Sequence, residues 1–367
     1  MTARLVSADS ETGQLPQIVL DNLDKRTAQI ASPVLNYTKQ PSAKWFAAKA
    51  KADAGTGHAK LLVVGDSKSW GYPEGMATSW PTTMLSRAFS GSRTQPGASI
   101  PGVRSALDPR WAVPTNWETV FGPGSGALYA NPGTGASAIY TPGVIVDTID
   151  VWWYKALNKG AFVVSIDGVA KTAIDTNSTD GSGGWRKTTY TVTAAANHVV
   201  SFAPPTTNPV SVFVDAYLDT SKSVRLANWG VIGSTTGTWA DGPYSTDAIT
   251  AWAPDLTLIM LGTNDGGNSV PASTWSANVG KLIDAAKVTG DVVLLSCIPS
   301  QSATNLAGET AYRDAAPALA ASKDIPFIDV FSKVGPWDTN LFADNLHPNA
   351  RGYGWTARTV AAGLRSL

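Results

Sequence analysis

Short apolar runs alternate with helical patterns in two separate parts of this chain of 367 residues. In the first part, the run Leu61–Val64 enters Gly65-Asp66-Ser67 and is followed by a helical pattern near 77–89. After residue 222 the alternation returns, with strands expected at 224–228, 256–261, 292–298 and 327–331. Such runs are typical of parallel strands that are buried on both faces. The pattern therefore predicts an α/β fold with a parallel sheet covered by helices on both sides.

The intervening residues, 106–222, have a different texture. They are dense in Gly, Pro, Thr and Ser, and their apolar residues recur at every second position. Strands are expected at 127–131, 137–142, 148–156, 161–168, 185–193, 198–204 and 209–220. The pair Asp167-Gly168 predicts a hairpin turn. We expect a jelly-roll-type β-sandwich that interrupts an α/β domain made of 46–105 and 223–367, and a carbohydrate-binding module is one interpretation of this sandwich.

Residues 1–45 are mostly polar and contain no long apolar stripe. They are interpreted as an arm or linker through which the chain forms a homo-oligomer or joins a virion, and a disordered terminus is the alternative. No apolar core of a secretory signal is visible, and no run approaches the ~18 apolar residues of a membrane span. The sequence predicts no membrane span.

Charge and composition exclude several functions. The chain has 28 basic and 28 acidic residues, so it lacks the positive field of a general nucleic-acid binder. Charged residues make up only 15%, which fits a protein that acts outside a cytoplasm. The single cysteine, Cys297, excludes an intrachain disulfide, and together with three scattered histidines it argues against a metal site.

Aromatic residues give a hint about the ligand, because the chain contains 14 tryptophans. Trp152 and Trp153 occupy adjacent positions of an expected strand, so their side chains face opposite sides. One is expected in the core. The other is a candidate for stacking on a sugar, with packing against the neighbouring domain as the alternative.

The polar residues that could carry chemistry follow the expected parallel strands. Ser67 comes directly after the first strand, where it could cap a helix or act as a nucleophile. Asp344 precedes His347 by three positions, so its carboxylate could hold one ring nitrogen and leave the other for Ser67. Such a pair can also merely cap a helix. Because ligands of parallel sheets bind beyond the carboxyl ends of the strands, we expect these residues to converge.

An acyl transfer also requires donors for the oxyanion of the tetrahedral intermediate. Asn264 follows a core strand and could offer its side-chain amide, while Gly233 could offer a backbone N–H. The Ser67 backbone N–H is a third candidate. Taken singly, Asn264 and Gly233 could equally be turn-forming residues.

Together, four segments resemble the sequence blocks of the SGNH (GDSL-type) hydrolases. They are Gly65-Asp66-Ser67, Asn228-Trp229-Gly230-Val231-Ile232-Gly233, Gly262-Thr263-Asn264-Asp265 and Asp344-Asn345-Leu346-His347-Pro348-Asn349. The resemblance implies a flavodoxin-like three-layer α/β/α domain with strand order 2-1-3-4-5. It also implies ester hydrolysis through an acyl-serine, without metal or cofactor. Two features depart from the family: Lys68 follows the nucleophile, and the gap from Ser67 to Gly233 is unusually long.

The sequence thus predicts a serine esterase. In this interpretation Ser67, His347 and Asp344 form the catalytic triad, while Ser67, Gly233 and Asn264 bind the oxyanion. The low charge, the tryptophans and the expected sandwich favour O-deacetylation of a polysaccharide or cell-envelope glycan. A lipid ester is a lesser alternative. The alternative from another class is a glycan-binding adhesion module, for example in a phage tail, with a secondary or inactive esterase site.

Overall fold

The computed structural model describes residues 34–35, 42–89, 94–96, 98–99, 110–115, 117–119, 128–130, 135–205, 207–208, 210–240 and 245–367. The α/β elements are β1 (Val34–Leu35), α2 (Ala43–Asp53), β2 (Ala59–Asp66), α3 (Ser67–Trp70), the 3₁₀ turn η1 (Met76–Thr78), α4 (Trp80–Ala88), β3 (Thr94–Pro96), β17 (Val224–Val231), α5 (Thr236–Ala240), α6 (Ser245–Trp252), β18 (Leu256–Met260), α7 (Thr263–Gly267), α8 (Ala272–Lys287), β19 (Asp291–Leu295), α9 (Ala303–Lys323), β20 (Phe327–Ile328), α10 (Val330–Val334) and α11 (Ala350–Arg365).

The central sheet has seven strands in the order β1-β20-β19-β18-β2-β17-β3. Its five inner strands, from β17 to β20, are parallel to one another. When these five are numbered along the chain, they run 2-1-3-4-5, so the expected strand order is confirmed. Two edge strands extend this arrangement, because β1 pairs antiparallel with β20 and β3 pairs parallel with β17.

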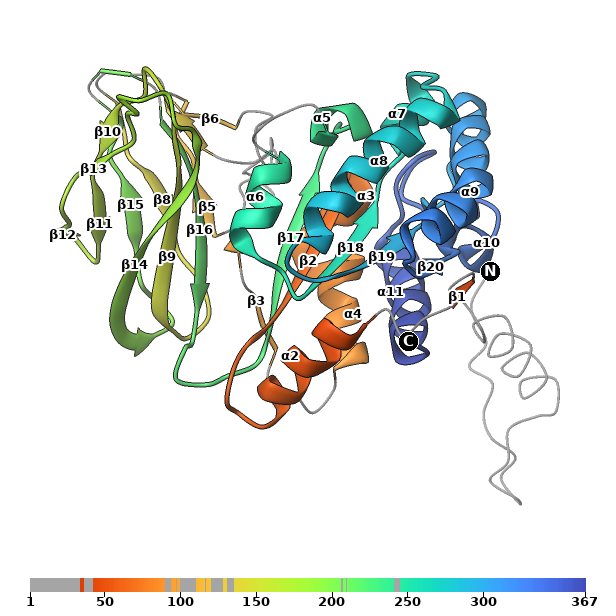
Figure 1. The fold of residues 1–367 in the computed structure, drawn as a ribbon, viewed down its shortest axis with the longest axis horizontal. Helices are drawn as coiled ribbons and strands as arrows, with labels where there is room; N and C mark the ends of the chain where they lie inside the picture. The colour runs from red at the N-terminus through yellow and green to blue at the C-terminus, as the bar shows by residue number, and fades with distance from the viewer. Residues whose placement is uncertain are drawn as a thin grey trace.

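Helices cover both faces of this sheet (Figure 1). Alternate side chains of β2 point to opposite sides, so Leu62 and Val64 pack in one cluster with α5, α6, α8 and α9. Leu61 and Val63 pack in the other cluster with α2, α4, α10 and α11. All four side chains have 0% exposure. A strand buried on both faces requires the continuous apolar run seen in the sequence.

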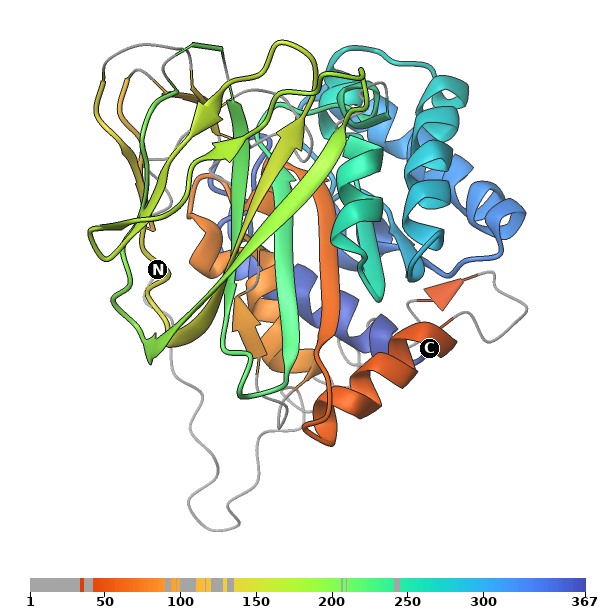
Figure 2. The same cartoon turned by 60° about the vertical axis from the view of Figure 1, so that its left-hand side comes forward.

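Two antiparallel sheets are formed by strands that lie between β2 and β17 in the chain, and Figures 1 and 2 show them (orange through yellow to green) beside the α/β part. Their strands are β4 (Ala98–Ser99), β5 (Trp111–Ala112), β6 (Trp117–Thr119), β7 (Leu128–Ala130), β8 (Ala138–Tyr140), β9 (Val146–Lys155), β11 (Val164–Ile166), β12 (Val169–Ala170), β14 (Gly184–Ala195), β15 (Val200–Phe202) and β16 (Val210–Tyr217); β10 (Ala161–Phe162) and β13 (Ile174–Asp175) form a separate pair.

The two antiparallel sheets, ordered β12-β11-β15-β8-β5 and β14-β9-β16-β7-β6, contribute side chains to one shared apolar cluster. The expected hairpin at Asp167-Gly168 joins β11 to β12, and both turn residues have positive φ, 53° and 77°. That 106–222 forms a separate inserted domain stays a prediction, and parts of this range, such as 120–127, lie outside the described residues.

The longer antiparallel sheet packs against the α/β part through aromatic side chains. Trp152 on β9 is 7% exposed and belongs to the same cluster as Trp229 and Trp252. Its ring stacks on Phe213, with centroids 5.5 Å apart and planes 6° from parallel. The expectation that Trp152 could stack on a sugar is therefore wrong, because its indole is buried where the sheet meets the α/β part.

Differences from the expected elements concern the N-terminal segment and the last strand. Most of residues 1–45 lie outside the described residues, but β1 pairs with β20, and residues 43–45 already belong to α2. The strand expected over 327–331 ends at Ile328, and α10 begins at Val330. In the part of the chain that the structure describes, no helix combines the length and apolarity needed to cross a membrane.

Candidate active site

The turn between β2 and α3 presents Ser67 at the carboxyl end of β2, between the neighbouring strands β17 and β18. The Asp66 carboxylate accepts a hydrogen bond of 2.9 Å from the Lys68 backbone N–H, which caps α3. On the neighbouring strand β17, the Asn228 amide donates to the Ser69 carbonyl at 2.9 Å. Gly65 allows this tight packing, since a Cβ there would lie 2.1 Å from the Ser69 hydroxyl oxygen. The turn that carries Ser67 is thus held both by the Asp66 cap and by the Asn228 side chain of the neighbouring strand.

Ser67, His347 and Asp344 form a continuous line of hydrogen bonds. The Ser67 hydroxyl oxygen lies 3.0 Å from His347 Nε2, although the two residues are 280 positions apart. On the other side of the ring, His347 Nδ1 lies 2.9 Å from Asp344 Oδ2. Asp344 Oδ1 also accepts the backbone N–H groups of Leu346 and His347, at 2.7 and 2.6 Å. The structure therefore brings together the serine, imidazole and carboxylate that the sequence singled out.

The surroundings of these three side chains favour a neutral His347 imidazole beside an ionised Asp344 carboxylate. Burial lowers the pKa of His347 below its ordinary value of 6.5, and this outweighs the opposing effect of the Asp344 carboxylate. Burial alone would raise the pKa of Asp344, but hydrogen bonds from the His347 ring and backbone and from Leu346 bring it below its ordinary value. A neutral imidazole with a free electron pair on Nε2 can accept the Ser67 proton.

Gly233 and Asn264, the candidate oxyanion donors outside α3, follow the two strands that flank β2 in the sheet. Val231 at the end of β17 pairs with Asp66, and Met260 at the end of β18 pairs with Gly65, so Gly233 and Asn264 follow strands that flank the Ser67 turn. The Asn264 side chain donates to the Ser234 carbonyl at 2.8 Å. A primary amide carries two N–H groups, so this bond orients Asn264 and leaves a second donor.

Asp265 also supports the loop that contains Ser234, a role that the sequence analysis did not assign to it. Its carboxylate has 0% exposure and accepts the Thr236 backbone N–H at 3.0 Å, as well as the Thr236 hydroxyl. Gly233 begins this loop with φ of +84°, a conformation that L side chains rarely adopt. Asn264 and Asp265 together fix the segment 233–236 against the β18 end of the sheet.

Sequence reasoning missed the partner of Lys68. The Lys68 ammonium is buried and lies 2.8 Å from Glu309 Oε1 on α9. It also donates to the Ser300 hydroxyl at 2.9 Å and to the Ile298 carbonyl. The other carboxylate oxygen of Glu309 accepts the Ser300 backbone N–H at 2.8 Å. Lys68 therefore ties the Ser67 turn to the loop after β19, which explains its departure from the family pattern.

Tyr72 is a second residue that the sequence did not single out. Its ring lies 4.7 Å from the His347 imidazole, centre to centre, at an angle of 69°. An edge-to-face contact of this kind restricts how the imidazole can turn. The Tyr72 carbonyl accepts a hydrogen bond from the Tyr353 hydroxyl on α11, which links this contact to the helix after His347.

Of the remaining candidate residues, Trp153 lies apart from this site, on the antiparallel sheets. Its side chain packs on the cluster that these sheets share and lines a pocket there. Among the described residues, no group of three His, Cys, Asp or Glu side chains could hold a metal ion.

Comparisons with known proteins identify the family of this chain and solved structures of similar fold. The profile of the GDSL-like lipase/acylhydrolase family matches residues 193–355, a range that includes Gly233, Asn264, Asp344 and His347 but not Ser67. An arylesterase from Vibrio mimicus is 30% identical over 156 residues, which span 42% of this chain and 76% of that protein. A solved peptidoglycan O-acetylesterase has the same fold, with a TM-score of 0.69 over 91% of this chain and 99% of that chain, at 15% identity. The chain therefore belongs to the GDSL-like lipase/acylhydrolase family.

Proposed function

We propose that this chain is a serine esterase in which Ser67 is the nucleophile, His347 the general base and acid, and Asp344 the group that orients the imidazole. The observation that supports these roles is the line of hydrogen bonds from Ser67 Oγ through both ring nitrogens of His347 to Asp344, at 3.0 and 2.9 Å. A serine hydroxyl is a poor nucleophile alone and requires such a base.

In the first half of the reaction, Ser67 Oγ attacks the ester carbonyl carbon while His347 Nε2 takes the hydroxyl proton. The tetrahedral intermediate then collapses, and His347 gives that proton to the departing alcohol oxygen. In the second half, His347 takes a proton from water, and the resulting hydroxide attacks the acyl-serine. Collapse releases the carboxylic acid and returns the proton to Ser67. Asp344 remains ionised throughout and stabilises the imidazolium.

The negative charge of each tetrahedral intermediate requires donors that are already in place. We assign this role to the backbone N–H groups of Ser67 and Gly233 and to the side-chain amide of Asn264. The hydrogen bond from Asn264 to the Ser234 carbonyl supports the assignment, because it fixes the amide before the substrate arrives.

For the substrate, we propose an O-acetylated glycan, from which the enzyme removes acetate. One structural relative with the same fold is a peptidoglycan O-acetylesterase, and its match spans 91% of this chain. We further propose that 106–222 is an inserted unit that contributes to glycan recognition. The low charged fraction of 15% also suits a neutral or weakly charged substrate.

Acetate release from an O-acetylated cell-envelope polysaccharide tests this proposal. The wild type is expected to release acetate, and Ser67→Ala is expected to release almost none. A series of p-nitrophenyl esters of increasing acyl length serves as the comparison, and the rate is expected to be highest for acetate. A clear optimum at long acyl chains, with no release from the polysaccharide, would instead identify a lipid esterase.

A further inference from the structure

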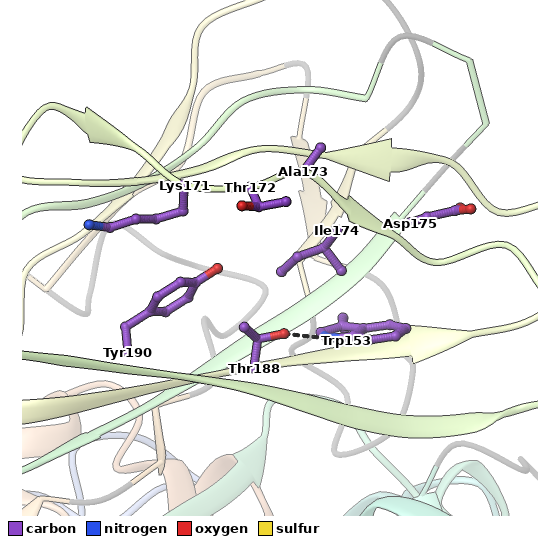
Figure 3. Close-up of a pocket in the computed structure, with 8 residues that line it drawn as sticks. All are labelled: Trp153, Lys171, Thr172, Ala173, Ile174, Asp175, Thr188 and Tyr190. Carbon is purple, nitrogen blue, oxygen red and sulfur yellow. Dashed lines mark hydrogen bonds between the residues drawn. The ribbon is translucent and has the colours of Figure 1, made fainter.

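A pocket of about 460 Å³ lies within the antiparallel sheets, where β14 faces the segment before and along β13 (Figure 3). Its lining residues are Trp153, Lys171, Thr172, Ala173, Ile174, Asp175, Thr188 and Tyr190. None of the residues assigned to ester hydrolysis lines it. The volume falls within the range of roughly 300–1,000 Å³ that is usual for small-ligand sites.

The base of the pocket is formed by apolar groups that are held rigidly. Trp153 packs on the shared cluster of the antiparallel sheets, and its indole N–H donates to the Thr188 hydroxyl at 3.1 Å. This hydrogen bond, drawn in Figure 3, fixes the orientation of the ring. Ile174, which is 8% exposed, lies across from the indole as part of the opposite wall. The pocket therefore offers a preformed aromatic surface.

Tyr190 supplies an unused polar group. Its hydroxyl oxygen is buried, and among the described residues it has no hydrogen-bond partner. Figure 3 shows this hydroxyl pointing from β14 toward the segment 172–174, across the space of the pocket. A buried hydroxyl without a partner is costly and rare in folded proteins. A ligand that donates to or accepts from this oxygen would remove that cost.

The charges of the pocket lie at its two ends. Figure 3 shows the Lys171 ammonium and the Asp175 carboxylate pointing away from the centre in opposite directions. Asp175 is also engaged by the Asn177 backbone N–H at 2.9 Å. The polar groups near the centre are thus neutral hydroxyls, those of Tyr190, Thr188 and Thr172. Such a set does not compensate a phosphate or carboxylate, whose burial requires a paired charge.

We propose that this pocket is a saccharide-binding site that holds a neutral sugar unit of a glycan. The C–H face of a sugar ring suits the aromatic base of Trp153, and sugar hydroxyls, which both donate and accept, suit Tyr190 and Thr188. This binding role rests on the proposed function and extends it, since a second glycan contact on the same chain raises the effective concentration of the scissile ester at Ser67.

Binding of defined oligosaccharides to the full chain tests the site. The probes are neutral β-1,4-linked oligomers of N-acetylglucosamine, glucose and xylose, titrated by calorimetry and by ligand-observed NMR. All variants carry Ser67→Ala, so no ester is consumed. Tyr190→Phe removes only the unpartnered hydroxyl and is expected to weaken binding by roughly three- to tenfold. Thr191→Ala is the matched control, because Thr191 is exposed on the opposite face of the same strand and lies outside the pocket.

The expected result is that at least one oligosaccharide binds, that Tyr190→Phe weakens it, and that Thr191→Ala does not. The proposal is overturned when no oligosaccharide of the set binds, or when both variants bind as tightly as the parent. With Ser67 restored, Tyr190→Phe is expected to keep full turnover of p-nitrophenyl acetate. Loss of glycan binding thus tests the pocket, whereas failure to release acetate tests the proposed esterase, and each result can occur without the other.

Discussion

The Lys68 ammonium lies 2.8 Å from the Glu309 carboxylate, and the two side chains are only 1% and 0% exposed. Lys68 directly follows Ser67 in α3, while Glu309 lies on α9 and also accepts the Ser300 backbone N–H in the loop after β19. A buried ion pair gives the turn a fixed attachment, because any shift of α3 would separate two charges inside the protein.

Replacing one partner of this pair should be costly. We expect Glu309→Gln to lower the free energy of unfolding by about 3–5 kcal/mol, because the Lys68 charge then stays buried without compensation. Urea denaturation of wild type and variant measures the difference. The double variant Lys68→Met/Glu309→Leu, which removes both charges, should be more stable than Glu309→Gln. A Glu309→Gln protein as stable as the wild type would show that the pair does not hold the turn.

The reaction should depend on a group that titrates below pH 6.5. Because burial lowers the pKa of His347 from 6.5, the imidazole stays neutral to a lower pH than a free histidine would. We expect kcat/KM for p-nitrophenyl acetate to be constant near neutral pH and to fall tenfold per unit once the pH drops below that pKa.

Asp66 is a second group that titrates near this pH, since burial raises its pKa to about 6. Its contribution to the pH profile must be distinguished from that of His347. Asp66→Asn keeps the Oδ1 acceptor for the Lys68 N–H and removes the titration. In this variant the acidic limb of the pH profile should persist with its midpoint below 6.5. Its disappearance would assign the limb to Asp66 and contradict the role given to His347.

Asn264 should contribute to the rate and little to stability. We expect Asn264→Ala to lower kcat by roughly 10²–10³, the usual effect of removing one oxyanion donor, and to leave measurable activity. Thermal unfolding checks that the variant remains folded. A variant with wild-type kcat would remove Asn264 from the oxyanion site.

Gly65 lies two residues before Ser67 and takes no part in the chemistry. Its position should nevertheless tolerate no side chain, because the space beside it is filled. A Cβ at this position would lie 2.1 Å from the Ser69 hydroxyl oxygen and 3.1 Å from the Met260 carbonyl. We expect Gly65→Ala to displace α3 and to lower both kcat and the melting temperature. Gly354→Ala in α11 is the control, because a Cβ there meets nothing within 4 Å, and it should leave kcat unchanged and should not lower the melting temperature, since alanine favours a helix more than glycine does. Equal behaviour of the two variants would contradict this packing.

Features set by local sequence could be predicted well. The apolar runs located the strands of the parallel sheet, and the family resemblance supplied their order. The hairpin at Asp167-Gly168 follows from two residues that adopt positive φ easily. His347 and Asp344 are only three positions apart, so their contact depends on a single tight turn.

Features set by contacts between distant segments could not be predicted. Glu309 is 241 positions from Lys68, and nothing in either neighbourhood points to the other. The alternation of a strand placed Trp152 and Trp153 on opposite faces but could not say which face the α/β part covers. Similarly, the strand expected over 327–331 stops early because the Asp329 carboxylate accepts the Ser332 backbone N–H and caps α10, a contact that is evident only in the folded chain.

Covalent labelling with a fluorophosphonate, followed by peptide mapping, shows whether His347 activates Ser67, since this reagent reacts with a serine only when a base activates it. We expect one adduct per chain, on Ser67, with labelling abolished in Ser67→Ala and strongly slowed in His347→Ala. An adduct on a different residue, or labelling of Ser67 at the same rate without the His347 imidazole, would contradict this activation of Ser67 by His347.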